Sequence, residues 1–99
     1  MKDEFVSRVG IWGQRHYNYL KMNSPTVINA MRMKGTLEQY LQDVDRDAEK
    51  IFSQLIKQLA EQDGITETLK VSDQMEWVQR MNAVRAQATE IVNKELIFI

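Results

Sequence analysis

The strongest constraint on the fold is a run of apolar residues that recur at intervals of three and four between residues 37 and 59. This spacing places them on one face of an α-helix, because a helix repeats every 3.6 residues. Thr36 and Gln39 have the spacing of a capping box, and Asp63 and Gly64 form a stop signal. The pattern predicts one amphipathic helix of about 27 residues, about 40 Å long. Its apolar residues are Leu37, Tyr40, Leu41, Val44, Ala48, Ile51, Phe52, Leu55, Ile56 and Leu59.

A second apolar stripe after Gly64 predicts an antiparallel partner for this helix. Either Thr66 or Asp73 is expected to start it, and Glu76 lies three residues after Asp73. Two long helices joined by a tight turn lie antiparallel, as a helical hairpin. Their apolar arcs are wider than one facing helix covers, so we expect shorter helices or a second copy of the chain to pack there. The stripe consists of Trp77, Val78, Met81, Val84, Ala88, Ile91, Val92 and Leu96.

The N-terminal third predicts two shorter helices. Ser24 and Pro25 read as an N-cap followed by proline at the first helical position, and Gly35 closes that helix. Residues 11–22 carry a helical stripe of their own.

These elements predict one all-α domain over residues 1–99, with short helices in residues 1–35 packed on a long antiparallel helical hairpin in residues 36–99. The hairpin is long for so short a chain, which is compatible with a homodimer. The final "LIFI" fits either a strand-like tail or a last helical turn. No apolar run approaches the roughly 18 residues of a membrane-spanning helix, and "MKDEFVSRVG" is charged where a signal peptide is apolar. We therefore expect a cytoplasmic protein with no membrane contact.

Charge is unevenly distributed although the net charge is only −1. Residues 1–36 carry six Lys or Arg and two acids, whereas residues 37–64 carry three Lys or Arg and seven acids. A basic segment is where phosphate contact is expected, and an acidic segment repels phosphate. Residues 11–34 also fit a helix-turn-helix, although two helices and a short turn are common in any bundle. The nucleic-acid-binding candidates are Arg8, Arg15, Lys21, Arg32 and Lys34.

An acidic string, "DVDRDAE", lies inside the predicted long helix. It begins like a calcium loop, but Ala48 stands where the loop needs glycine and Gln54 where it needs its final glutamate. We interpret it as a solvated helix face, with docking onto a basic partner surface as the alternative. The protein-binding candidates on this face are Asp43, Asp47 and Glu49.

Asp45 and Arg85 are predicted to form a structural ion pair at the edge of the core. Each lies at an edge of the apolar arc of its helix, and the two positions face each other if the hairpin turns about Ile65. The alternative is two unrelated solvated charges.

Few residues could support catalysis. The chain has no cysteine and one histidine, His16, so no thiolate site is available and no second histidine can complete a metal site or a nucleophile–base pair. "GIWG" lacks the spacing and the Lys-Ser/Thr of a phosphate-binding loop. We expect a packed or half-exposed His16, no catalytic residues, no metal, no cofactor and no enzyme activity.

Three segments, "DGITETLK", "EWVQRMN" and "EIVNKELI", resemble the TnpV family, small proteins encoded on conjugative and mobilisable transposons of Gram-positive bacteria. The resemblance covers residues 35–99, and "GIWGQRH" and "YLK" extend it upstream to Gly10. The family has been likened to excisionase-type accessory proteins, whose work requires DNA contact. Its members carry a strongly basic stretch around "YLK", where this chain has only Arg15 and Lys21 as charged residues in "QRHYNYLKMNS".

The resemblance implies a mobile-element accessory protein built on a helical scaffold without an active site. One hypothesis is an excisionase-like recombination accessory protein that binds DNA, alone or beside a recombinase, through the five basic candidates. The other is a protein-directed inhibitor or adaptor, for example an anti-CRISPR protein that docks its acidic face into the basic channel of an RNA-guided host defence nuclease. On charge alone we favour a protein or nucleoprotein partner over free DNA.

Overall fold

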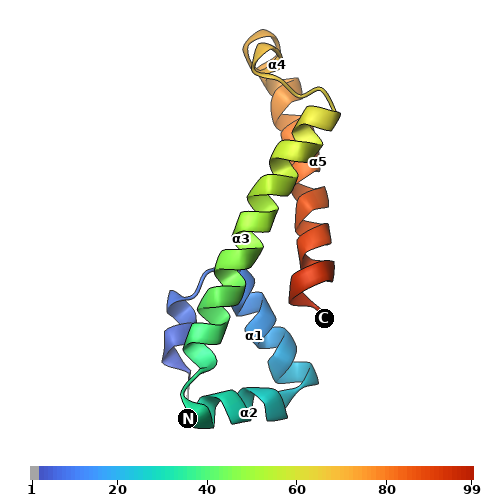
Figure 1. Ribbon diagram of the computed structural model, residues 1–99. Helices are drawn as coiled ribbons and strands as arrows, with labels where there is room; N and C mark the ends of the chain where they lie inside the picture. The colour runs from blue at the N-terminus through green and yellow to red at the C-terminus, as the bar shows by residue number, and fades with distance from the viewer. Residues whose placement is uncertain (1–2) are drawn as a thin grey trace.

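The computed structural model describes residues 3–99, and within them the chain is helical without a strand (Figure 1). Two long helices run antiparallel, and shorter N-terminal helices pack beside the first half of the earlier one. This arrangement confirms the predicted all-α hairpin. The elements in chain order are the 3-10 turn η1 (Glu4–Arg8), α1 (Ile11–Asn23), α2 (Pro25–Lys34), α3 (Leu37–Gln62), α4 (Glu67–Ser72), α5 (Gln74–Val92) and the π-helical turn η2 (Asn93–Ile97).

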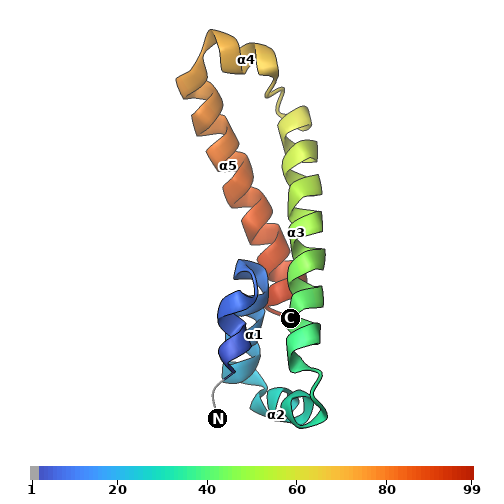
Figure 2. The same cartoon turned by 90° about the vertical axis from the view of Figure 1, so that its left-hand side faces the viewer.

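The molecule is elongated, with extents of 55 × 22 × 17 Å and a radius of gyration of 17.0 Å. A compact chain of this length would have a radius of gyration of about 13 Å. We call residues 3–55 and 85–99 the base and residues 56–84 the tip. Helices α3 and α5 diverge toward the tip, and α4 lies across the space between their ends (Figure 2).

Within residues 3–99 the core is divided into three clusters along the long axis. The base holds two of them, because α1, α2 and η2 add layers to the α3–α5 pair. The tip holds one, which only α3, α4 and α5 enclose. The base clusters are Val9, Tyr17, Leu20, Ile28, Leu37 and Leu41, and Trp12, Ala48, Val92 and Ile97; the tip cluster is Ile65, Met81 and Val84.

Both residues predicted as alternative starts of the second long helix are N-caps. The Thr66 hydroxyl accepts a hydrogen bond from Leu69 N and starts α4, whereas the Asp73 carboxylate accepts one from Glu76 N and starts α5. The connection is therefore longer than the predicted tight turn, because α4 is inserted into it. The predicted capping box at Thr36 is not formed: its hydroxyl lies 3.4 Å from Met31 O, as a donor at the end of α2.

The "LIFI" tail continues the helix rather than forming a strand. Leu96 and Ile97 belong to η2, and Ile97 is fully buried against the base. Phe98 and Ile99 follow the turn and are exposed, with the Phe98 ring centroid 5.6 Å from that of Tyr19.

The predicted ion pair between Asp45 and Arg85 is not formed. Asp45 Oδ1 instead accepts a hydrogen bond from Gly13 N at 3.0 Å, and Arg85 Nη1 lies 3.4 Å from Asn82 Oδ1 in its own helix. The prediction was wrong because it assumed a tight turn about Ile65 and left α1 out of account. In the structure, α1 covers the face of α3 that carries Asp45.

Helix α1 approaches α3 closely because glycine stands at two positions of "GIWG". A Cβ atom on Gly13 would lie 2.8 Å from Leu41 O, and one on Gly10 would collide with the Asp45 carboxylate. The carboxylate thus reaches the free N–H groups in the first turn of α1, where the helix dipole favours negative charge. A side chain of α3 therefore caps α1.

Candidate interaction surfaces

The basic candidate Arg32 is engaged with an acid of the same chain. Arg32 Nε donates to Asp3 Oδ1 at 2.9 Å and Arg32 Nη2 donates to Asp3 Oδ2 at 2.6 Å. The Tyr17 hydroxyl donates to Asp3 Oδ2 at 2.6 Å. The Asp3 side chain is 4% exposed and that of Arg32 is 30% exposed. The three residues join η1, α1 and α2 at the base.

This network shifts the pKa values of its members. The hydrogen bond from Arg32 is the main cause that lowers the pKa of Asp3 to about 2; the Tyr17 hydrogen bond and the charges of Arg32 and Lys21 act in the same direction, and burial opposes them. The pKa of Arg32 is raised, chiefly by the same hydrogen bond. Burial and the hydrogen bond to Asp3 raise the pKa of Tyr17. At neutral pH the site is therefore a charged pair held by a neutral phenol.

The other basic candidates also lie on elements of the base. Arg8 Nη2 is 3.8 Å from Glu38 Oε2, the Arg15 guanidinium lies 5.1 Å from the Trp12 ring centroid, and Lys21 Nζ lies 5.9 Å from the Tyr17 ring centroid. Lys34 is exposed in the last turn of α2. Arg32 is thus the basic candidate held by short bonds to an acid, whereas the Arg8 side chain is 66% exposed beside Glu38.

The acidic candidates do not form one uniform stripe. Arg46 Nη2 is 3.2 Å from Asp43 Oδ1, and Arg46 Nε is 3.7 Å from Asp47 Oδ1, so one arginine offsets part of their charge. Glu49 Oε2 accepts a hydrogen bond from Trp12 Nε1 at 2.9 Å and so helps to hold α1 on α3. Asp43 and Asp47 remain on the surface, whereas Glu49 has a structural contact.

His16 is buried at the junction of α1, α3 and η2. Its Nδ1 lies 2.8 Å from Ile97 O, and its Nε2 lies 2.7 Å from the Tyr40 hydroxyl. A carbonyl oxygen only accepts, so Nδ1 carries the proton and, in the neutral ring, Nε2 accepts from Tyr40. Burial raises the pKa of Tyr40. The histidine is packed, and both of its nitrogens are used for structure.

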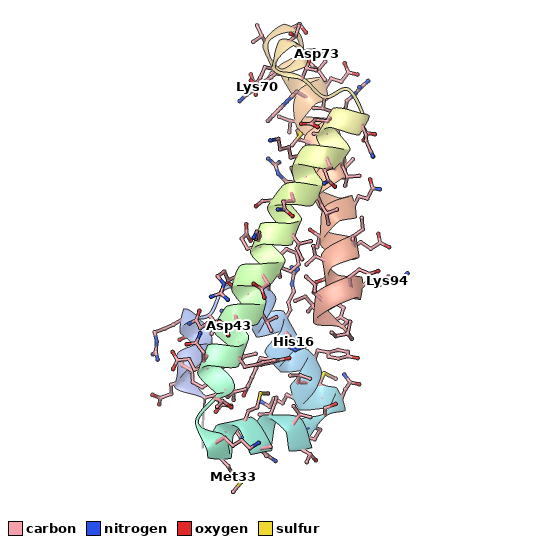
Figure 3. All side chains as sticks on the ribbon, in the orientation of Figure 1. His16, Met33, Asp43, Lys70, Asp73 and Lys94 are labelled. Atoms are coloured by element: carbon pink, nitrogen blue, oxygen red, sulfur yellow. The ribbon has the colours of Figure 1, made fainter. Side chains whose placement is uncertain are left out.

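An exposed apolar patch at the tip was not singled out by sequence reasoning. The tip patch consists of Val71, Met75 and Val78, with exposed fractions of 86%, 76% and 41%. A shallow hollow of about 310 Å³ lies beside Met75 and Val78, and Gln74 and Gln79 also line it. The available signal was that Val71 and Met75 are apolar residues off the stripe that begins at Trp77. Figure 3 marks Lys70 and Asp73 at this end and Met33 at the opposite end.

Two kinds of site lack support in the part of the chain that the structure describes. No group of three or more histidine, aspartate and glutamate side chains within residues 3–99 is placed to hold a metal ion. None of the helices seen there combines the length and apolar character needed to cross a membrane.

A family model described as "Transposon-encoded protein TnpV" matches residues 1–97 of the chain. No curated protein and no solved structure matches the chain. The match covers nearly every residue of both the base and the tip.

Proposed function

This chain belongs to the TnpV family of transposon-encoded proteins, and we propose that it acts as a non-enzymatic mobile-element accessory protein that binds a protein or nucleoprotein partner. The partner would be a recombinase or a host defence nuclease. The contact we favour is the tip patch.

The exposure of the tip patch is the observation that carries this proposal. Soluble proteins expose single apolar side chains often, but an apolar group spread over adjacent elements commonly marks a contact surface. Val71 lies on α4, and Met75 and Val78 lie on the first turns of α5. The caps at Thr66 and Asp73 hold these two helices in place. Methionine is enriched in protein interfaces because its flexible side chain adapts to a partner's surface.

The polar chemistry of the base supports a non-enzymatic role. His16 is buried with both ring nitrogens in hydrogen bonds to the protein itself. A general base must reach a substrate proton, directly or through one water molecule, and this imidazole has no free nitrogen for that purpose.

The internal pairing of basic side chains favours a protein partner over free DNA. Arg32 is bound to Asp3, and Arg8 lies beside Glu38. Phosphate neutralisation by Lys and Arg supplies most of the affinity for non-specific DNA, so paired arginines contribute less to it.

The test is a pull-down of the tagged protein from lysate of its host, with and without nuclease, using two variants. One variant, Val71→Ser/Met75→Gln, removes apolar surface at the tip. Its matched control, Met22→Gln/Met33→Gln, removes two exposed methionines at the base. We expect a protein that remains after nuclease treatment, is lost with the tip variant and is retained with the control.

The same experiment discriminates the alternatives. If the captured protein is an RNA-guided effector nuclease, the anti-CRISPR function is supported; if it is a recombinase, the recombination function is supported. Capture that disappears after nuclease treatment would favour the excisionase-like DNA-binding function instead. Equal loss of the partner in both variants would contradict the assignment of the contact to the tip patch.

A further inference from the structure

We propose that Arg32, Tyr17 and Lys21 form a phosphate-binding site at the base that Asp3 occupies as an internal substitute for the phosphate of a nucleic acid. The site lies at the opposite end of the molecule from the tip patch. It does not rest on the proposed function.

The donors of α1 and α2 converge on one carboxylate from a different segment. Arg32 presents Nε and Nη2 as a fork to the two oxygens of Asp3, and the Tyr17 hydroxyl donates to one of them. A guanidinium fork can bind a carboxylate or a phosphate in the same two-bond manner, because both present two oxygens at similar spacing. Lys21 Nζ lies 5.9 Å from the Tyr17 ring centroid, so a second positive charge stands near these donors.

The donors keep their positions through contacts that do not involve Asp3. The Tyr17 ring is buried in the first base cluster, and Arg32 Nη1 donates to Asn29 Oδ1 at 2.7 Å within α2. A hollow of about 210 Å³ lies beside Arg32. Glu38 also lines that hollow, and its carboxylate lies 3.8 Å from the Arg8 guanidinium. An external anion thus has a preformed fork and a space beside it.

Asp3 is held less firmly than the residues it contacts. It is the N-cap of η1, which contains no fully buried residue and packs only the partly buried Phe5 and Val6 against the first base cluster. Displacement of this segment would therefore cost less than displacement of α1 or α2, which contribute Tyr17, Leu20 and Ile28 to the core.

Phosphate fits the surroundings better than an acidic protein. Residues 1–36 carry six Lys or Arg against two acids, and Asp3 is one of those acids. Displacement of Asp3 would free Arg32 within the most basic part of the chain. The protein as it stands should therefore bind nucleic acid weakly, because a tethered carboxylate competes with every incoming phosphate.

The test measures binding of a short fluorescent DNA duplex by anisotropy, at low and at physiological salt. Asp3→Ala opens the site, and Glu4→Ala removes the same charge from the adjacent exposed residue as a control. Asp3→Ala/Arg32→Gln removes the fork as well. We expect Asp3→Ala to bind about tenfold more tightly than the wild type, since a charge-assisted hydrogen bond to phosphate is gained. Glu4→Ala should stay within about twofold, and the double variant should return to the wild-type value.

Several outcomes would overturn the proposal. They are an unchanged affinity of Asp3→Ala, an equal gain in Glu4→Ala, or a gain that persists without Arg32. Circular dichroism checks that each variant is folded; if Asp3→Ala is not, Asp3→Asn, which keeps the side-chain shape, is judged by the same criteria. Competition with polyglutamate at matched charge separates the ligand classes. Displacement of DNA by polyglutamate as effective as by unlabelled duplex would assign the site to acidic proteins and reject phosphate.

Discussion

At the base, six elements meet around two core clusters, and side chains join segments far apart in the sequence. At the tip, three helices enclose one cluster, and the side-chain hydrogen bonds found there are local: the caps at Thr66 and Asp73, the bond of the Ser72 hydroxyl to Leu69 O, and the bond of Arg85 Nη1 to Asn82 Oδ1 at the border with the base. Within residues 3–99, every side-chain hydrogen bond between segments at least a dozen residues apart lies in the base: Trp12 with Glu49, Gly13 with Asp45, His16 with Tyr40 and Ile97, and Asp3 with Tyr17 and Arg32.

The pair of long helices, α3 and α5, therefore has one strongly restrained end and one less restrained end. Distant hydrogen bonds need precise geometry, so they fix the arrangement of the base. The tip lacks that restraint, so its exposed Val71, Met75 and Val78 lie on helices that are freer to adapt to a partner. Exposed apolar residues of the base, such as Met22 and Met33, lie on helices that those bonds restrain. Four predictions test the contrast, in order of decreasing effect.

The largest effect is expected from truncation of the buried core. Leu41→Ala in the base should cost about 4 kcal/mol of unfolding free energy, whereas Met81→Ala in the tip should cost about 2 kcal/mol, because the tip has fewer layers and collapses more readily around a cavity. Leu41 is fully buried and Met81 is nearly so. Urea unfolding of the two variants measures the difference. Equal costs would mean that base and tip are equally well packed.

The second largest loss of stability is expected where α1 approaches α3 closely, at Gly13. Gly13→Ala should cost about 3 kcal/mol, because the added methyl group meets Val9 and the backbone oxygen of Leu41, and the bond to Asp45 is strained. Asn18→Ala, an exposed site in the same helix, is the control and should change stability by less than about 0.5 kcal/mol. A Gly13 variant as stable as this control would show that α1 has room to move.

The Asp3 network makes the stability of the folded protein depend on pH in the acid range. The pKa of Asp3 is about 2 in the folded protein against 3.8 for an unperturbed aspartate, so its carboxylate adds about 2 kcal/mol above pH 3.8. That contribution is lost as the pH falls from 3.8 through 2, because the folded pKa is the lower one. Asp3→Asn should therefore be less stable than the wild type at neutral pH, and the gap in urea unfolding should close at pH about 2. A gap that is constant with pH would exclude the ion pair as its source.

The smallest effect is expected at the tip. Asp73→Ala should cost about 1 kcal/mol through loss of the α5 cap, and Asp73→Asn should retain most of it. Hydrogen exchange should show the loss in the first turn of α5, with the base amides unchanged. Faster exchange throughout the base would show that tip and base unfold as one unit.

The parts of the fold that could be predicted from the sequence are those with local signals. Pro25 and Gly35 mark the beginning and the end of α2, and the apolar stripe predicts α3 to within a residue or two. Thr66 and Asp73 were alternatives for one helix start, and each starts a helix of its own. The short α4 was missed because six residues are too few to show a period.

The contacts of the candidate sites could not be predicted in the same way. Asp3 and Arg32 are 29 residues apart, and no periodicity links them. Arg32 was therefore predicted as a free basic residue. Asp45 was assigned to Arg85 because the position of α1 was unknown, and only the crossing of α1 over α3 brings Gly13 to it. The tip patch could not be predicted for a different reason. The exposure of its residues depends on how much of α5 the neighbouring helices cover, and the sequence does not give that coverage.

The hydrogen bond between His16 and Ile97 spans 81 positions, and this separation has a consequence for the order of folding. Closing a loop of this length is slow, because the chain loses conformational entropy before the stabilising contact forms. During synthesis, residue 16 leaves the ribosome long before residue 97. The His16 imidazole and its apolar neighbours therefore stay exposed to solvent until residue 97 emerges. The tip contacts, such as those among Ile65, Met81 and Val84, are nearer in sequence and close earlier. We therefore expect the second base cluster, which needs Val92 and Ile97, to assemble after the tip.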